Sequence, residues 1–224
     1  MTTRAPIIGI STDIAEAKYG ERWFSYRTYA HAITKAGGLP VAMSPDANLA
    51  SDYAERLDGF VLTGGDDPVM EPFGVATDAR VTPVHTDRQA FESSLIEALL
   101  VADKPMLGVC LGMQMMALHA QGKLDQYMPD STDGVATHWD VDHDVAMTHV
   151  AGGMRTGVVH SRHKQAITDA GTLAVVGRSP DGVIEAIADT SRRFWVGVQW
   201  HPERTAFAPL GSGLFDGLIA AARS

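Results

Sequence analysis

Short apolar runs alternate with amphipathic stretches along most of the chain, and the two patterns predict strands and helices in turn. The expected strands are residues 6–10, 39–43, 58–63, 106–109, 173–177, 183–188 and 194–198. The expected helices are residues 26–36, 87–102, 111–119 and 214–222. This alternation is typical of an α/β protein in which helices cover both faces of a mostly parallel sheet.

Two segments add detail to this pattern. In the helix at residues 87–102, Phe91 and Leu95 lie on one apolar stripe, and Thr86 with Gln89 fits a capping box at its start. Residues 122–160 are rich in Gly, Asp, His and Thr and contain only short β-like runs. We therefore expect loops and a small antiparallel excursion there.

Composition agrees with one folded unit. The chain has 224 residues, of which 45% are hydrophobic and 20% are charged, so it can bury a substantial core. Chains of about this length with an α/β pattern commonly form one domain. We expect a single domain over residues 1–224.

The charge balance and the cysteine content exclude several partners and compartments. Lys and Arg number 18 against 27 Asp and Glu, a net charge of −9, and no basic run exceeds Arg192-Arg193. Nucleic-acid and membrane partners are therefore not expected, because both need basic patches or long apolar stretches. A lone cysteine cannot form an intramolecular disulfide, so we expect a cytoplasmic protein. The sequence leaves open whether the chain forms a homo-oligomer.

That cysteine lies where chemistry is plausible. The run Gly108-Val109-Cys110-Leu111-Gly112 falls at a strand-to-helix junction. Small residues two positions on either side let backbones approach a nucleophile held on a tight turn, as in the G-x-S-x-G elbow. The helix N-terminus favours a thiolate. The alternative is a buried cysteine with a structural role only.

A base for this nucleophile is available at the end of the strand at residues 194–198. His201 follows this strand, and Glu203 lies two residues later across a proline. A carboxylate at that spacing can set the tautomer of the histidine and stabilise its imidazolium form. The alternative is an ordinary surface histidine that follows a strand.

Other polar clusters do not predict further sites. His138, His143 and His149 lack the regular helical spacing of metal ligands, so no metal and no cofactor are expected. Asp66 and Asp67 follow the glycine pair that ends the strand at residues 58–63. They could attract a cationic amine, but a turn-forming role is favoured.

With both motifs in view, the chain resembles the class I glutamine amidotransferase superfamily. Within that superfamily it is most similar to the γ-glutamyl-γ-aminobutyrate hydrolase family, from Ile7 to Glu203. The stretches that carry the narrower resemblance are residues 57–68, 161–166 and 179–186, together with Gly-Val-Cys-Leu-Gly-Met-Gln and Gln-Trp-His-Pro-Glu around the two motifs.

The resemblance implies a flavodoxin-like three-layer sandwich that carries a Cys-His-Glu triad. It maps Cys110 to the nucleophile, His201 to the acid and base, and Glu203 to the residue that orients the histidine. The oxyanion hole of the family falls on the backbone N–H groups of Gly65 and Leu111.

The resemblance also places substrate contacts, and it shows where this chain departs from the family. Gln114 and Ser161 match positions at or beside the glutamyl part of the substrate. The family has asparagine before that serine and a second histidine before the following glutamine, where this chain has His160 and Lys164. We expect these differences to affect the leaving group.

The sequence thus predicts a cysteine hydrolase that cleaves the γ-glutamyl amide bond of a small molecule through a thioester on Cys110. Its expected partner is a small γ-glutamyl amide such as γ-glutamyl-γ-aminobutyrate. The alternative enzyme is a glutaminase subunit that supplies ammonia to a synthetase. A binding protein without catalysis is disfavoured, because it has no need of Cys110, His201 and Glu203 together.

Overall fold

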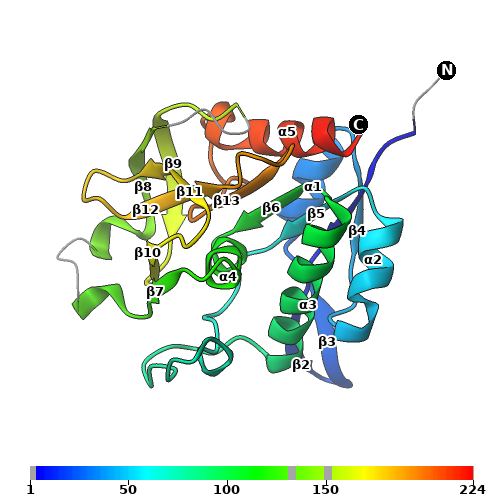
Figure 1. Cartoon of the computed structure of the whole chain (residues 1–224), viewed down its shortest axis with the longest axis horizontal. Helices are drawn as coiled ribbons and strands as arrows, with labels where there is room; N and C mark the ends of the chain where they lie inside the picture. The colour runs from blue at the N-terminus through cyan, green and yellow to red at the C-terminus, as the bar shows by residue number, and fades with distance from the viewer. Residues whose placement is uncertain (1–3, 131–134, 149–152, 224) are drawn as a thin grey trace.

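The computed structural model describes residues 4–130, 135–148 and 153–223 (Figure 1). Its strands are β1 (Ile7–Ile10), β2 (Asp13–Ala17), β3 (Gly20–Phe24), β4 (Leu39–Ala42), β5 (Gly59–Leu62), β6 (Met106–Val109), β7 (Lys123–Asp125), β8 (Trp139–Met147), β9 (Gly157–Arg162), β10 (Ala166–Asp169), β11 (Ala174–Arg178), β12 (Ile184–Ala188) and β13 (Trp195–Val198). Its α-helices are α1 (Arg27–Lys35), α2 (Ala50–Arg56), α3 (Thr86–Ala102), α4 (Leu111–His119) and α5 (Ser212–Ala222). In the part of the chain described, no helix combines the length and the apolar character needed to cross a membrane.

The main sheet has a parallel half and an antiparallel half that meet at β13. Its order is β4-β1-β5-β6-β13-β12-β11-β8-β9. The first five of these strands pair in parallel. Numbered among themselves along the chain, they run 2-1-3-4-5, which is the flavodoxin-like order.

The antiparallel half begins where β12 pairs with the far side of β13. It continues through β11, β8 and β9, while β10 and β7 branch from β12. The excursion expected at residues 122–160 is present, and it is larger than expected because it also recruits the strands between residues 157 and 188.

Helices cover both faces of the parallel half, which confirms the three-layer arrangement (Figure 1). On one face, α1 and α5 pack together and bury Ile33 and Leu218. On the other face, α2, α3 and α4 bury a second apolar cluster that includes Phe91, Leu95 and Met113. These two clusters hold the carboxyl ends of the parallel strands in fixed positions.

The sequence pattern missed some elements. The hairpin β2-β3 pairs Asp13 with Phe24, but most of its residues are exposed or half-buried, so no alternation marks it as strands. Helix α2 spans only seven residues and buries Ala50 and Ala54, which is too short a stripe to recognise. Strand β10 was also missed.

The capping box predicted at the start of α3 is wrong. His85 is the N-cap, and its Nδ1 accepts a hydrogen bond from the Asp87 N–H at 3.2 Å. The Gln89 amide instead bonds both the N–H and the carbonyl of Val69. Gln89 therefore braces the loop after β5 and is not available to cap its own helix.

Candidate active site

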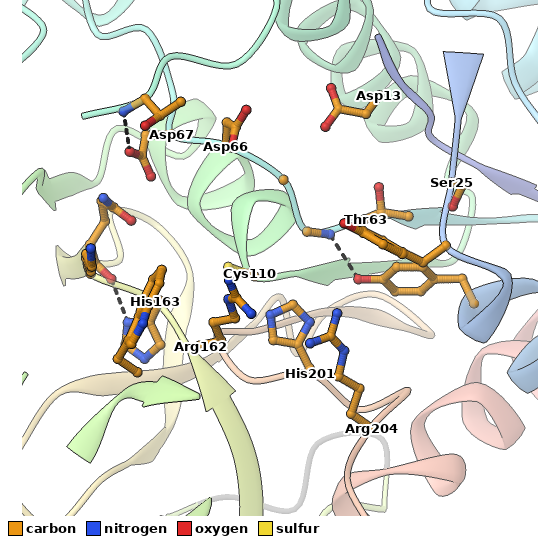
Figure 2. Close-up of a pocket in the computed structure, with 18 of the residues that line it drawn as sticks. Asp13, Ser25, Thr63, Asp66, Asp67, Cys110, Arg162, His163, His201 and Arg204 are labelled. Carbon is orange, nitrogen blue, oxygen red and sulfur yellow. Dashed lines mark hydrogen bonds between the residues drawn. The ribbon is translucent and has the colours of Figure 1, made fainter. Parts of the chain in front are cut away.

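The candidate site lies at the carboxyl ends of β5, β6 and β13, where ligands bind in open α/β sheets (Figure 2). A cavity of about 560 Å³ opens there. Its walls include Cys110 after β6, His201 after β13, and Gly64 and Gly65 after β5. The structure thus brings together four residues from three segments that are far apart in the sequence.

Cys110 occupies a sharp elbow between β6 and α4. Its φ of 51° and ψ of −105° lie outside the regions that non-glycine residues ordinarily adopt. A Cβ at Gly108 would lie 2.8 Å from the Gly112 backbone, and a Cβ at Gly112 would lie 2.4 Å from the Leu62 carbonyl oxygen. Both flanking glycines are therefore required by close backbone contacts, as the elbow motif predicts.

His201 and Glu203 form a pair within the site. The Nδ1 of His201 lies 2.9 Å from Oε1 of Glu203. Burial disfavours the charged imidazolium, but hydrogen bonds to Cys110 and Glu203 and the negative charges of both groups outweigh it and raise the pKa of His201 to about 10. This environment favours a protonated His201 beside Cys110.

Gln114 lies beneath the nucleophile and does not line the cavity. Its side chain is buried and donates to Oε1 of Gln199 at 3.2 Å. Gln199 in turn directs its Nε2 to the Cys110 sulfur at 3.5 Å. The structure therefore makes Gln114 a positioning residue for Gln199, a residue that sequence reasoning did not single out.

Ser161 is also buried, and it lies behind the cavity wall. Its hydroxyl donates to the His138 carbonyl at 3.2 Å. This bond ties β9 to the segment that precedes β8. Neither Ser161 nor Gln114 is among the residues that line the cavity, and the contacts expected between these two side chains and the glutamyl part stay predictions.

The loop after β5 presents the first expected oxyanion donor. The guanidinium of Arg88 is fully buried and donates from Nη2 to the carbonyl oxygens of Thr63 at 2.9 Å and Gly64 at 3.2 Å. Because no described peptide bond is cis, the Gly65 N–H points opposite to the Gly64 carbonyl, away from Arg88. Arg88 thereby fixes the orientation of this donor.

Arg88 is itself held by carboxylates. Its Nε donates to Glu92 at 3.0 Å, one turn further along α3, and its Nη1 lies 3.1 Å from Oδ2 of Asp13. On the other side of the loop, the Tyr29 hydroxyl accepts from the Gly64 N–H at 3.1 Å. Sequence reasoning missed Arg88, whose only signal is a basic and an acidic residue four positions apart within an apolar helix.

Leu111 supplies the second expected donor. It is the first residue of α4, and the N–H groups of a first helical turn have no partner within the helix. Its side chain is buried in the core, which anchors the turn. Of the oxyanion residues, the structure places the Gly65 backbone on the cavity wall and the Leu111 backbone directly after Cys110.

The cavity has walls of opposite charge. Figure 2 shows Asp13, Asp66 and Asp67 on the side of the β5 loop, and Arg162 and Arg204 on the opposite side. Burial raises the pKa of Asp66 and of Asp67, and the carboxylate of Asp13 adds to the effect on Asp66. Asp67 also accepts from the Thr82 N–H at 2.9 Å, a contact between residues 15 positions apart, so its side chain ties two loop segments together and does not cap the local turn favoured from sequence.

The two departures from the family pattern differ in position. Lys164 lines the cavity, and its Nζ lies 4.2 Å from the centre of the Trp139 ring. His160 is not among the cavity residues; its Nδ1 lies 2.9 Å from Asp142 and its Nε2 3.6 Å from Asp140. Of the two, Lys164 borders the cavity and His160 does not.

The structure also gathers potential metal ligands that the sequence left scattered. His138 and His143 lie together with His163 and Glu185, with all ligand atoms within 4.8 Å. The third histidine considered from sequence, His149, lies outside the described residues. The sequence did not indicate this cluster, because His163 and Glu185 lie 25 and 47 positions after His138.

The fold and the elbow together define a class I glutamine amidotransferase-like protein. Solved structures agree on the fold. The glutaminase domain of CTPS from Trypanosoma brucei, with bound acivicin, superposes with a TM-score of 0.68 at 14% identity, covering 97% of this chain and 94% of that one. A glutamine amidotransferase of Thermotoga maritima gives a TM-score of 0.59 at 15% identity, covering 89% and 76%.

Sequence comparison narrows the class to a family. The Peptidase C26 model matches residues 6–203, and the chain belongs to that family. The γ-glutamyl-γ-aminobutyrate hydrolase of Escherichia coli K12 is 27% identical over 96% of this chain and 93% of its own length. A glutamine amidotransferase-like protein of Rickettsia prowazekii is 27% identical over 97% of this chain and 98% of its own length. The protein is thus a glutamine amidotransferase-like hydrolase that acts on amides.

Proposed function

We propose that the protein hydrolyses the γ-glutamyl amide bond of a small conjugate through a covalent thioester. The observation that carries this proposal is the shared cavity. Cys110 lies on its strained elbow, the His201-Glu203 pair lies beside it, and the Gly65 backbone borders the same space. Nucleophile, base, orienting carboxylate and oxyanion donor are the parts that acyl transfer requires.

Acylation begins with the proton of Cys110 on His201. The thiolate attacks the γ-carbonyl carbon, and the N–H groups of Gly65 and Leu111 stabilise the negative charge on its oxygen. As the C–N bond breaks, His201 gives its proton to the departing amine. Glu203 keeps Nδ1 protonated, which leaves Nε2 of the ring to transfer the proton.

Deacylation reverses these roles. His201 accepts a proton from a water molecule, and the resulting hydroxide attacks the thioester carbonyl at the same oxyanion donors. The C–S bond then breaks and Cys110 leaves as a thiolate. The products are glutamate and the free amine, and no cofactor takes part in any step.

The charge distribution of the cavity supports a leaving amine that carries an acidic group. Arg162 ends β9, Lys164 lies in the turn to β10, and Arg204 follows His201 by three positions. The carboxylates of Asp13 and Asp66 on the opposite wall suit the α-ammonium group of the glutamyl part. γ-Glutamyl-γ-aminobutyrate has both an α-ammonium group on its glutamyl part and a carboxylate on its leaving amine. The relative in Escherichia coli is named as the hydrolase of this compound.

The test measures glutamate release from a panel of γ-glutamyl compounds. The panel contains the conjugates of aminobutyrate and putrescine, γ-glutamylethylamide, polyglutamate and glutamine. We expect the aminobutyrate conjugate to be preferred. Replacing the nucleophile, Cys110→Ala, should lower kcat by at least about 10⁴-fold, as loss of a triad member does elsewhere. Hydrolysis that survives this change would contradict the thioester. Preference for glutamine, with stimulation by an added synthetase, would instead establish a glutaminase subunit.

A further inference from the structure

A cluster of buried side chains lies behind the β9-β10 turn, outside the catalytic triad. His138 precedes β8, His143 lies within β8, His163 follows β9, and Glu185 lies in β12. His138, His163 and Glu185 are buried and His143 is half-buried. All four residues belong to the antiparallel half of the molecule, and none takes part in the proposed reaction.

The outer nitrogen of each ring already has an acceptor. The Nδ1 of His163 lies 2.8 Å from the Gln165 carbonyl oxygen, and the Nδ1 of His143 lies 2.9 Å from the Asp144 carbonyl oxygen. A carbonyl only accepts, so both of these nitrogens carry hydrogen. The Nε2 of His138 lies 2.9 Å from the carboxylate of Asp181, which selects the N–H form there as well.

The inner nitrogens therefore face one another as lone pairs when the rings are neutral. The Nδ1 of His138 and the Nε2 of His163 are 3.2 Å apart. Two lone pairs at this distance repel unless a positive centre lies between them. The Nε2 of His143 and the Oε2 of Glu185 are buried and make no hydrogen bond to the described residues. The Nε2 of His143 faces the cluster, 3.5 Å from Oε1 of Glu185.

The spacing of the inner atoms matches tetrahedral coordination. Glu185 Oε1 lies 3.2 Å from His138 Nδ1, 3.3 Å from His163 Nε2 and 3.5 Å from His143 Nε2. A zinc ion bound at about 2.0–2.1 Å by nitrogen and oxygen ligands has a ligand-to-ligand separation of about 3.3 Å in a regular tetrahedron. Four of the six separations are thus close to this value, and all four ligand atoms lie within 4.8 Å of one another.

We propose that His138, His143, His163 and Glu185 form a Zn²⁺ site of the structural type. Four protein ligands complete the coordination shell, so no position remains for water or substrate. Three imidazole nitrogens and one carboxylate suit zinc, and the outer hydrogen bonds to Asp181 and to two carbonyls supply the second shell that holds metal-binding rings in place.

The site deepens the proposed function, on which its role rests, because it supports the wall of the same cavity. His163 and its neighbour Lys164 stand on the turn that joins β9 to β10, and both line the cavity. The other ligands lie on different elements, so a bound ion would join that turn to β8 and β12. The ion would hold Lys164 in register with Cys110 without touching the substrate.

A single shared proton is the rival occupant of the cluster. Glu185 is fully buried, and its Oε1 lies within 3.5 Å of the inner nitrogen of all three rings. A buried carboxylate in this position requires a nearby cation. A proton can satisfy Glu185 and one ring, but it leaves Nε2 of His143 without a partner.

The decisive measurement is metal binding by the tag-free full chain. The protein is treated with a chelator and exchanged into metal-free buffer, and Zn²⁺ is then added in a calorimetric titration. A parallel titration uses Co²⁺, whose visible absorption reports tetrahedral geometry. We expect one equivalent of each ion and tetrahedral Co²⁺ bands. Absence of stoichiometric binding by the wild-type chain would overturn the proposal and leave the shared proton as the occupant.

Variants locate the bound ion. His143→Gln and Glu185→Gln should each weaken Zn²⁺ binding by more than about 100-fold, beyond the about 10–100-fold that loss of a second-shell partner causes. Cys110→Ala must retain one equivalent, because this variant excludes metal binding at the Cys110-His201 pair, where a thiol and an imidazole also meet. His31→Gln, an exposed histidine on α1, serves as the matched control and must also bind normally.

A variant of the second shell keeps the test valid when a ligand variant does not fold. Asp181→Asn leaves all four ligands in place and removes only the carboxylate that faces His138, so we expect about 10–100-fold weaker binding. Unchanged affinity in this variant and in a folded His143→Gln protein would place the ion elsewhere and refute the site. Glutamate release by the Cys110→Ala protein tests the catalytic proposal, and Zn²⁺ binding by the same protein tests the metal site, so failure of one is distinguishable from failure of the other.

Discussion

At the scale of single residues, the environment of His201 explains why a buried imidazole remains charged. Burial opposes the imidazolium form, yet the hydrogen bonds and negative charges of Cys110 and Glu203 place the pKa near 10. Cys110 and Glu203 thus stabilise the charged ring of His201 more than burial destabilises it. The Glu203 carboxylate, 2.9 Å from Nδ1 of His201, is part of this balance.

Replacing that carboxylate with an amide tests the balance. In Glu203→Gln, the negative charge that favours the imidazolium is gone, so the pKa of His201 should fall and kcat should drop about 10²–10⁴-fold. Steady-state kinetics and a pH titration of the His201 ring resonance measure the two effects. Glu55→Gln, an exposed carboxylate on α2, is the control. Full activity in Glu203→Gln would show that the histidine needs no orienting group.

The same shift links stability to pH. A histidine whose folded pKa is raised stabilises the fold fully below its unfolded pKa of about 6.5, and this contribution is lost as the pH rises towards 10. Urea unfolding at pH 6 and at pH 9 should therefore show a smaller difference for Glu203→Gln than for the wild type. Equal differences in the two proteins would contradict the assignment of the proton to His201.

Arg88 is a positioning residue, and its effect separates from that of the nucleophile. Arg88→Lys keeps a positive charge near Asp13 and Glu92. It loses the two hydrogen bonds from the guanidinium to the carbonyl oxygens of Thr63 and Gly64 in the β5 loop. We expect kcat to fall about 10²–10³-fold with little change in KM, as for loss of an oxyanion donor. Alkylation of Cys110 by iodoacetamide forms no oxyanion, so its rate should not change. A parallel loss of alkylation rate would assign Arg88 a general structural role.

The site residues that could be predicted from sequence are those that belong to a short, continuous motif. Cys110 lies between two glycines, and His201 lies two positions from Glu203, so each motif is readable by itself. Arg88 could not be found in this way, because its partners Thr63 and Gly64 are 25 and 24 positions away. The buried histidine cluster is hidden for the same reason, since its ligands converge only after the antiparallel strands pair.

At the scale of elements, the elbow depends on the contact between α4 and β5. The Gly112 backbone packs so closely on β5 that a methyl group would lie 2.4 Å from the Leu62 carbonyl oxygen. We expect Gly112→Ala to lower the free energy of unfolding by about 1–3 kcal/mol through overpacking, measured by urea denaturation. Met115→Leu on the same helix conserves volume and should cost less than about 1.5 kcal/mol. Equal midpoints for Gly112→Ala and wild type would refute this packing argument.

The β9-β10 turn is the element that we expect to recognise the leaving group. Lys164→Met should raise KM for γ-glutamyl-γ-aminobutyrate about tenfold, the effect of losing one charge-assisted hydrogen bond. γ-Glutamylethylamide has no second carboxylate, so its KM should stay constant. Steady-state kinetics with the two conjugates make the comparison. An equal rise for both substrates would mean that Lys164 binds the glutamyl part.

Elements with a long, one-sided apolar pattern were predictable, and those stabilised mainly by their neighbours were not. The parallel strands and α1, α3, α4 and α5 follow their patterns to within one or two residues. Hairpin β2-β3 lies largely exposed, and α2 buries only two alanines, so neither has a pattern of its own. The cap of α3 was misread because Gln89 bonds Val69, a contact outside the helix.

At the scale of the whole molecule, the two halves of the sheet have different tasks. The parallel half supplies the proposed nucleophile and oxyanion loop, and the proposed base, His201, follows β13 at the junction. The antiparallel half supplies Arg162 at the end of β9, Lys164 in the turn after it, and the histidine cluster behind that turn. In the proposed mechanism, reaction chemistry and leaving-group recognition thus belong to separate sets of strands.

Metal binding should be visible in the stability of the entire fold. A ligand present at a thousandfold excess over its dissociation constant stabilises the folded state by about 4 kcal/mol, which corresponds to roughly 10 °C in a domain of this size. Calorimetry with Zn²⁺ and with excess chelator should show this difference for the wild type. His143→Gln should unfold at the same temperature in both buffers, and an unshifted wild type would contradict the site.

The position of β13 between the two halves has a consequence for how such enzymes diverge. The proposed zinc ligands, their second shell and the basic turn all fall between residues 138 and 185, a continuous stretch of chain that contains no member of the triad. Changes within that stretch can alter the side chains that border the cavity opposite the β5 loop, while the segments that carry Cys110, His201 and Glu203 keep their sequence.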